Sequence, residues 1–247
     1  MNEFNLTDLL LQKFSTCIER MEVECSGEDA VAEHENEKLY LKVFSSAGDT
    51  ESPIEKISLM ILENGKVKNK DDKSTLDTGT FTTATIIPKD GLPIPMCALE
   101  GSYHFGKYIQ VRAEIPPLST NADYRETFCK PVQDLRGSLE NLPGLSPMTS
   151  LPGLEEYSSG GLMAGHLAPE HMETALRWFS DYIELYLGFV RNRDAYTVLQ
   201  DPAIISEGKS RKEGFCRMFA KMTPAILSDL PNLYSDELAG RLGGLLF

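Results

Sequence analysis

An acid, a hydroxyl and an imidazole occupy alternate positions in the stretch PIPMCALEGSYHF, as Glu100, Ser102 and His104. The stretch is rich in apolar and aromatic residues and reads as a β-strand, in which alternate side chains share a face. The three polar groups are therefore expected side by side on one face of a sheet. A carboxylic acid held away from water in such a place can donate a proton to a bound substrate.

The chain turns back directly after this strand, at Gly106-Lys107. Glycine at the first of two central positions is typical of a two-residue type II′ hairpin turn. That turn pairs Glu100 with Ala113 and places the carboxyl on the apolar face of the hairpin, where burial favours the neutral form of an acid. The side chains expected on this face are Ala98, Glu100, Ser102, His104, Ile109, Val111 and Ala113, and those on the opposite face are Tyr108, Gln110, Arg112 and Glu114.

Other environments remain open for Glu100. The side chain can lie at a sheet edge, or it can bond to a nearby hydroxyl or to His104. A shift of one residue in the turn would move the carboxyl to the water-facing side of the hairpin. The proposal of a neutral acid therefore depends on the register of the two strands.

Hydrophobic periodicity gives the elements that position the hairpin. Five consecutive strands between residues 39 and 116, joined by short turns, favour an antiparallel sheet. The acidic stretch 22–38 is expected to be a mobile loop. Helices are expected at 5–21, with Asn5 or Thr7 as its cap, and at 121–141, 170–193, 209–222 and 234–246, and residues 160–168 fit one more strand.

The sequence contains no internal repeat and no linker that divides the chain. We predict a mixed α/β fold of the α+β type, a three-layer α/β/α sandwich whose central antiparallel sheet is flanked by helices. Residues 1–247 are expected to form a single domain.

Composition excludes several classes of protein. The net charge of −13 argues against a nucleic-acid-binding protein. No apolar run approaches the ~18 residues of a membrane span, and no GxGxxG motif, P-loop or metal-ligand cluster is present. The five cysteines lie far apart without a CxxC pair, which indicates reduced thiols.

The residues around Glu100 resemble those of the ferredoxin-dependent bilin reductase superfamily, which includes the red chlorophyll catabolite reductases. In that superfamily two prolines precede a catalytic acid, and IPKDGLPIPMCALEGSYHF has this layout with Glu100 at the acid position. The stretch ADYRETFCKPVQDLRGSLENLPGLSP is similar to the chlorophyll catabolite branch, and residues 215–247 keep the length and terminal LLF of bilin reductases. The resemblance covers roughly residues 75–247.

The resemblance implies a reductase that carries no metal, flavin or nicotinamide of its own. Reduced ferredoxin would supply electrons one at a time to an open-chain tetrapyrrole, either a biliverdin-type bilin or red chlorophyll catabolite, lying between the sheet and the C-terminal helices. Glu100 would be the principal proton donor, while Ser102 and His104 would line the pigment site. We expect a reducing compartment, either the cytoplasm or the plastid stroma, and the sequence leaves the choice open.

Two positions depart from the family pattern. Thr223 in MTP takes the place of a second catalytic aspartate, and because threonine supplies no acidic proton, Asp229 or water would have to do so. Gly165 takes the place of an arginine that binds a substrate propionate. Both leave open a non-catalytic tetrapyrrole-binding protein on this fold, or an unrelated α/β domain. The candidates for a replacement propionate ligand are Arg112, Arg217 and Lys107.

The stretch GKSRKEGFCRMFAK, residues 208–221, is locally basic although the chain is acidic. Ferredoxins are acidic, and electrostatic steering depends on local charge. We therefore expect Lys209, Arg211 and Lys212, together with Arg217, to dock ferredoxin. A solvated helix surface without a partner is the alternative.

Overall fold

The structure is a computed structural model. It describes residues 5–46, 51–68, 75–104, 107–139, 143–151, 153–227, 230 and 232–246, and side chains at 67–68, 75–76, 222–227 and 243–246 are not described.

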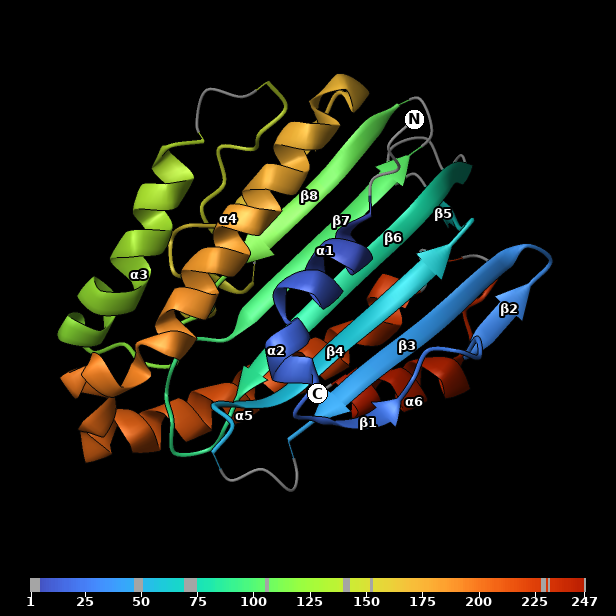
Figure 1. Cartoon of the computed structure of the whole chain (residues 1–247). Helices are drawn as coiled ribbons and strands as arrows, with labels where there is room; N and C mark the ends of the chain where they lie inside the picture. The colour runs from blue at the N-terminus through green and yellow to red at the C-terminus, as the bar shows by residue number, and fades with distance from the viewer. Residues whose placement is uncertain are drawn as a thin grey trace.

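A nine-stranded antiparallel sheet forms the middle layer of the molecule (Figure 1). Its main path runs β1-β3-β4-β6-β7-β8-β9, while β2 also pairs with β3 and β5 with β6. Consecutive strands mostly lie side by side because short turns connect them. The strands are β1 (Glu22–Cys25), β2 (Ala32–His34), β3 (Glu37–Ser45), β4 (Ile54–Glu63), β5 (Lys66–Lys68), β6 (Thr75–Pro88), β7 (Cys97–His104), β8 (Tyr108–Glu114) and β9 (Met163–Leu167).

Helices α1 (Leu6–Lys13), α2 (Ser15–Ile18) and α4 (Met172–Arg191) lie over one face of the sheet, with α3 (Ala122–Gly137) beside α4 (Figure 1). Asn5 caps α1 by accepting a hydrogen bond from the backbone N–H of Asp8 at 3.0 Å. The face of α4 that meets the sheet is aromatic, and burial of these rings supplies much of the main core. The fully buried aromatic residues of α4 are Trp178, Phe179, Tyr182 and Tyr186.

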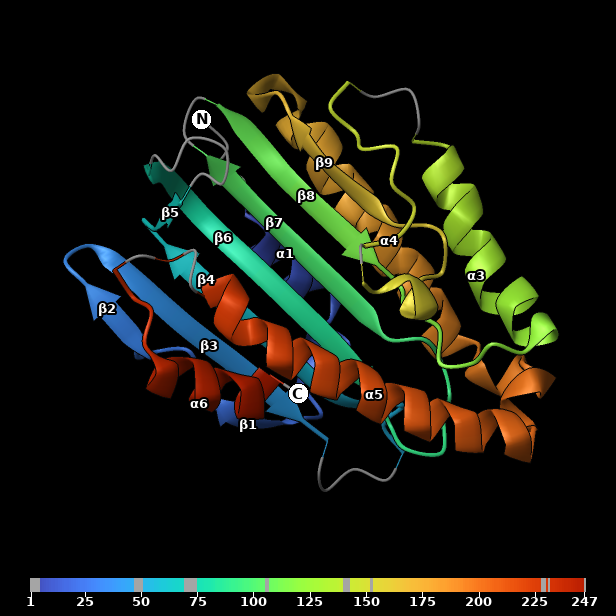
Figure 2. The same cartoon turned by 180° about the vertical axis from the view of Figure 1, so that it is seen from behind.

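Helices α5 (Pro202–Leu227) and α6 (Asp236–Leu246) cross the opposite face (Figure 2). A second apolar cluster lies beneath α6, where strand alternation directs one set of β3 and β4 side chains towards the helix. The buried members of this cluster are Leu39, Leu41, Val43, Met60, Leu62, Leu230, Leu233, Leu238, Ala239 and Leu242. The buried sheet residues of this cluster come from β3 and β4, and the partly buried Phe81 of β6 packs against them.

The predicted three-layer α/β/α sandwich is confirmed, as is the strand at the end of the 160–168 stretch. The acidic stretch 22–38 is not a loop, because β1 and β2 pair with β3 at the edge of the sheet. Strands at an edge tolerate exposed acids, since only one of their sides is paired. In the part of the chain that the structure describes, no helix combines the length and the apolar character needed to cross a membrane.

The predicted register of the β7–β8 hairpin is wrong by one residue. Glu100 pairs with Arg112 instead of Ala113, and His104 pairs with Tyr108. Three residues rather than two separate that last pair, and the N–H of Lys107 donates to the carbonyl of His104 at 2.9 Å. The remaining turn residues, 105 and 106, lie outside the described part of the chain. A shift of one residue moves the β8 side chains that were expected beside Glu100 to the other face of the sheet and brings the alternate β8 side chains to the Glu100 face.

Candidate functional site

Glu100 lies on the sheet face that α5 and α6 cross. Paired residues on neighbouring strands share a face, and pairing aligns Met60, Thr83, Glu100 and Arg112 in one row across β4, β6, β7 and β8. Met60 belongs to the cluster beneath α6, which fixes the face of the whole row. Figure 2 views this face, with β7 and β8 visible between α5 and β9.

Polar and aromatic side chains occupy the β7–β9 part of this face. Ser102 and His104 share it with Glu100, as expected from their alternate spacing. The partner strand contributes polar residues here and not the apolar set that the two-residue turn predicted, because the register has shifted. We call this set the polar patch, and it consists of Glu100, Ser102, His104, Tyr108, Gln110, Arg112 and His166.

The carboxylate of Glu100 forms an ion pair with Arg112, with Oε2 and Nη1 3.0 Å apart. Its other oxygen, Oε1, accepts a hydrogen bond from the side-chain amide of Gln110 at 2.5 Å. The Glu100 side chain is 15% exposed and that of Arg112 is 40% exposed. The expectation that Glu100 lies among apolar side chains is therefore wrong, since both of its oxygens have polar partners.

His104 is buried beside Ser102, whose Oγ lies 2.9 Å from His104 Nε2. Burial, and to a smaller extent the nearby His166 and Lys107, lowers the pKa of His104 to about 4. Burial and Arg112 also lower the pKa of His166. The His104 imidazole is consequently neutral near pH 7 and does not supply a proton from its charged form.

The aromatic rings of the polar patch lie against one another across three strands. The ring centroids of His104 and Tyr108 are 4.5 Å apart, and those of Tyr108 and His166 are also 4.5 Å apart. The three tilted rings therefore pack in one row, in which His104 is buried.

His166 is a member of the polar patch that the sequence reading did not select. Gln110 pairs with His166, whereas Gly165 pairs with Val111, whose side chain belongs to the main core on the other face. A side chain at position 165 would therefore point away from Glu100. Alternation in GGLMAGHLA places Gly165 and His166 on opposite faces of the strand. Which of the two faces Glu100 shares depends on the register of β8 and β9.

The structure changes the set of residues available for docking a partner. Lys212 is buried, with Nζ 2.7 Å from Glu55 Oε2 and 3.3 Å from the carbonyl oxygen of Pro88, and it also binds Asp90. The expectation that Lys212 faces a protein partner is therefore wrong, because it attaches α5 to β4 and to the loop after β6. Only the lysine of these ion pairs is buried, since the side chains of Glu55 and Asp90 are half exposed.

The other basic residues of α5 differ in exposure. The guanidinium of Arg211 lies 5.0 Å from the ring centroid of Tyr157 and donates to the carbonyl of Glu156. Lys209 and Arg217 have side chains that are 60% and 68% exposed, with acidic neighbours 3.9 Å and 3.6 Å away. Thr223 lies within α5 but its side chain is not described, and residue 229, the expected Asp229 proton source, lies outside the described residues.

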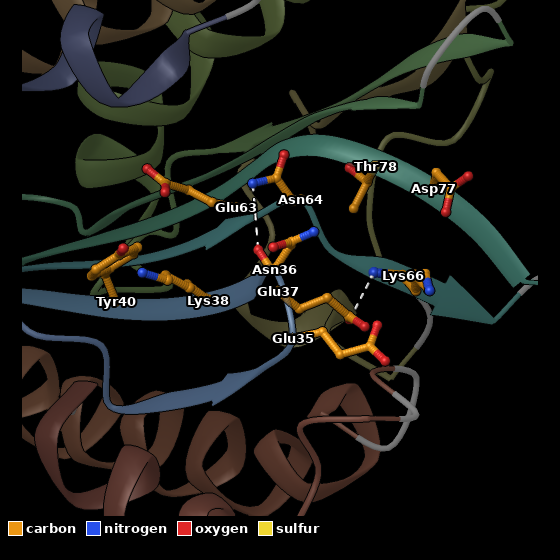
Figure 3. A pocket seen from close by; sticks show the side chains of 10 residues that line it. All are labelled: Glu35, Asn36, Glu37, Lys38, Tyr40, Glu63, Asn64, Lys66, Asp77 and Thr78. Carbon is orange, nitrogen blue, oxygen red and sulfur yellow. Dashed lines mark hydrogen bonds between the residues drawn. The ribbon is translucent and has the colours of Figure 1, made fainter.

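A polar pocket of about 580 Å³ lies away from Glu100, at the ends of β3, β4 and β6 (Figure 3). Its one deeply buried acid, Glu37, accepts hydrogen bonds from the backbone N–H of Lys66 at 3.1 Å and from the side-chain amide of Asn232 at 2.5 Å. Among the residues that the structure describes, no three His, Cys, Asp or Glu side chains are grouped so as to hold a metal ion. The lining residues are Glu35, Asn36, Glu37, Lys38, Tyr40, Glu63, Asn64, Lys66, Asp77 and Thr78.

Neither a family model nor a curated protein matches the sequence. Among solved structures, the chain is similar to phytochromobilin synthase from tomato in complex with biliverdin, with a TM-score of 0.67 and 13% sequence identity. The match covers 97% of this chain and 81% of the tomato protein, and at this identity it establishes the fold. The chain therefore has the fold of phytochromobilin synthase, and the resemblance to bilin reductases expected from Glu100 and its neighbours is confirmed at the level of the fold.

Proposed function

We propose that this chain binds an open-chain tetrapyrrole on the polar patch and reduces it with electrons from reduced ferredoxin. Residues 1–247 would act as one bilin-reductase-like domain without a metal, flavin or nicotinamide of their own. The observation that carries the proposal is the Glu100–Arg112 ion pair on the sheet face crossed by α5, in a fold that holds biliverdin in the tomato protein. The substrate is a biliverdin-type bilin or red chlorophyll catabolite.

Arg112 is the residue we propose for binding a propionate of the pigment. Its guanidinium is partly exposed, and guanidinium groups bind carboxylates through two parallel hydrogen bonds. An incoming propionate would compete with Glu100 for this cation. Glu100 would then lose its charged partner while the pigment excludes water, and a carboxylate in such surroundings takes up a proton that it can donate.

The remaining groups of the polar patch have supporting roles in this proposal. Ser102 holds the ring of the buried His104, against which Tyr108 lies, and the rings of Tyr108 and His166 offer aromatic surface to a conjugated ligand. Asp229 or water remains the proposed source of a second proton, since threonine occupies position 223.

A non-catalytic tetrapyrrole carrier is the second candidate. The hydrogen bonds that the Glu100 carboxylate already accepts within the protein favour it. Both oxygens already accept hydrogen bonds, from Arg112 and from Gln110. If the pigment leaves these contacts in place, Glu100 stays bonded to Arg112 and Gln110 and does not engage the pigment. Binding without reduction is the expected behaviour of such a carrier.

Mixing the purified protein with biliverdin tests both candidates. For the reductase we expect a shift in the long-wavelength absorbance on binding, followed by loss of that band when reduced ferredoxin is added. A stable complex that does not change with reduced ferredoxin, for biliverdin and for red chlorophyll catabolite alike, would identify a carrier. Absence of any spectral shift with either pigment would contradict both.

Reversing two exposed charges on α5 should weaken the use of ferredoxin. In Lys209→Glu/Arg217→Glu we expect the KM for ferredoxin to rise about tenfold at low ionic strength and kcat to change little, because steering depends on local charge. The difference should shrink near 0.5 M salt, as screening shortens the range of these charges to roughly 4 Å.

Arg177→Glu is the matched control, since Arg177 is an exposed cation on α4, over the other face of the sheet. An equal rise in KM for the control, or no rise in the double variant, would remove α5 from the docking surface.

A further inference from the structure

Glu114 ends β8, and its carboxyl group is buried among neutral hydrogen-bonding groups. Only 7% of the residue is exposed. Its Oε1 accepts a hydrogen bond from the backbone N–H of Ile115 at 3.0 Å and another from the hydroxyl of Ser159. The Ser159 hydroxyl in turn accepts from the N–H of Gly161 at 3.0 Å, so the hydrogen atom of Ser159 is free to point at Glu114.

The hydroxyl of Ser158 lies between two acceptors, one of which is Glu114. Ser158 Oγ is 3.0 Å from the carbonyl oxygen of Thr149, which can only accept and which also accepts from the backbone N–H of Leu162 at 3.3 Å. The N–H of Gly160 donates to the same Oγ at 2.9 Å. Ser158 Oγ also lies 3.0 Å from Glu114 Oε2, so its one hydroxyl hydrogen has two acceptors at equal distance. Both contacts are hydrogen bonds at once when Oε2 itself carries a proton.

The titratable groups that interact electrostatically with Glu114 are neutral at pH 7. They are Cys97 of β7, Cys129 of α3 and Tyr182 of α4, and burial raises the pKa of each, that of Cys129 to about 11. Burial is also the largest influence on Glu114, and it raises the pKa of this carboxyl although the surrounding hydrogen bonds act in the opposite direction.

Three arginines face the chain segment around Ser158, but each donates to backbone carbonyls. Within the described ranges, none of them forms an ion pair with Glu114. The contacts are Arg125 with Ser158, Arg136 with Leu162 and Ser146, and Arg211 with Glu156 and Pro117.

We propose that Glu114 is a neutral carboxylic acid in the folded protein. The hydrogen bond from its proton to Ser158 would hold the neighbouring edge segment against the end of β8. The edge segment is residues 143–151 and 153–162, and it closes the outer edge of β9. The N–H of Ser146 donates to Ala164 at 2.7 Å, and the N–H of His166 donates to Gly144 at 3.0 Å. Loss of the proton would place a charge in a buried site and leave Ser158 with two acceptors for one hydrogen, so the segment loosens as pH rises.

The sign of the pH effect follows from proton binding. An unfolded glutamate releases its proton near its ordinary pKa of 4.5, while the folded group retains it to higher pH. Between the ordinary pKa and the raised pKa, the folded state binds one more proton than the unfolded state, so stability falls as pH rises. The contribution is complete below the ordinary pKa and is lost as pH passes the raised pKa of the folded state.

Glu114→Gln is the decisive variant, because its amide NH₂ can replace the proposed O–H donor to Ser158 while its carbonyl keeps the role of Oε1. We expect the urea midpoint of Glu114→Gln at pH 7 to equal or exceed that of the wild type. The wild type should lose stability relative to Glu114→Gln as pH rises from the ordinary pKa of the acid towards its raised pKa in the folded state. Glu114→Ala should have a lower midpoint at every pH, since it leaves Ser158 and Ser159 without their partner.

Glu126→Gln is the control, since it makes the same chemical change at an exposed position of α3. It should leave the midpoint and its pH dependence unchanged. A midpoint of Glu114→Gln as low as that of Glu114→Ala at pH 7 would overturn the proposal, because an ionised Glu114 would then be the native form.

Two spectroscopic measurements do not depend on stability. With ¹³C-labelled glutamate side chains, one carboxyl resonance should remain in the protonated range at pH 7 and be missing from Glu114→Gln. Hydrogen exchange of the amides of Ser146, Leu162 and His166 should accelerate with pH more in the wild type than in Glu114→Gln. Ionised resonances for every glutamate, or equal exchange in the two proteins, would contradict the proposal.

Discussion

Glu100→Gln is expected to bind the pigment at least as tightly as the wild type and to reduce it about 100-fold more slowly or not at all. Glutamine keeps the size of the side chain and can still accept from Gln110, but it has no acidic proton. Loss of a general acid typically costs 10²- to 10⁴-fold in rate, so about 100-fold is a lower estimate. Binding is measured by absorbance titration and turnover by decay of the pigment band with reduced ferredoxin.

Arg112→Gln tests the role of the cation in the ion pair separately from the role of the acid. The proposal assigns Arg112 to the propionate, and a charge-assisted hydrogen bond contributes about 1.5–3 kcal/mol, so the affinity for pigment should fall roughly 10- to 100-fold. Chemistry in the bound complex should be less affected than in Glu100→Gln. Glu63→Gln, an exposed glutamate at the end of β4, is the control for both. Unchanged turnover in Glu100→Gln would remove this carboxyl from the mechanism.

The layers of the fold were predictable because their signals are local. Alternation in LYLKVFS predicts β3, and its Leu39, Leu41 and Val43 are all fully buried. The aromatic spacing on α4 likewise predicts a buried helix face. The edge strands β1 and β2 were missed because edge strands need little apolar surface, so acidic residues hide their periodicity.

The register of β7 against β8 was not predictable, although the two strands were. It depends on whether two or three residues form the turn after His104, and this choice decides whether Glu100 meets Ala113 or Arg112. Lys212 shows a related limit. Its sequence neighbours are polar, and only tertiary packing against Glu55 and Asp90 makes it a buried ion-pair residue.

The sheet face that carries Glu100 has an apolar part and a polar part. Beneath α6 its β3 and β4 side chains are apolar and contribute to the core. Across β7, β8 and β9 the same rows continue as acid, guanidinium, amide and imidazole groups, which contribute little apolar burial. These polar side chains bond to one another, as Glu100 does to Arg112 and Gln110. Their concentration on a part of the face that adds little to the core supports the proposal that this part binds a ligand.

Gly165→Ala is expected to destabilise the protein by about 3 kcal/mol, and Gly165→Arg by at least as much. A Cβ atom at this position would overlap the carbonyl oxygen of Gly144 and approach Leu145 Cα at 2.9 Å. Both neighbours are backbone atoms of the edge segment, which cannot rotate away, and overpacking of this kind costs roughly 1–3 kcal/mol or more. Urea unfolding monitored by Trp178 fluorescence measures the loss.

Gly188→Ala is the matched control for this prediction. Gly188 lies inside α4, and a Cβ there meets no atom within 4 Å. Alanine favours a helix interior over glycine by about 1 kcal/mol, so this variant should be as stable as the wild type or slightly more stable. Because position 165 shares its face with Val111, Gly165→Arg should also fail to tighten pigment binding. Tighter binding together with wild-type stability would mean that β9 presents residue 165 to the polar patch, against the pairing of β8 and β9.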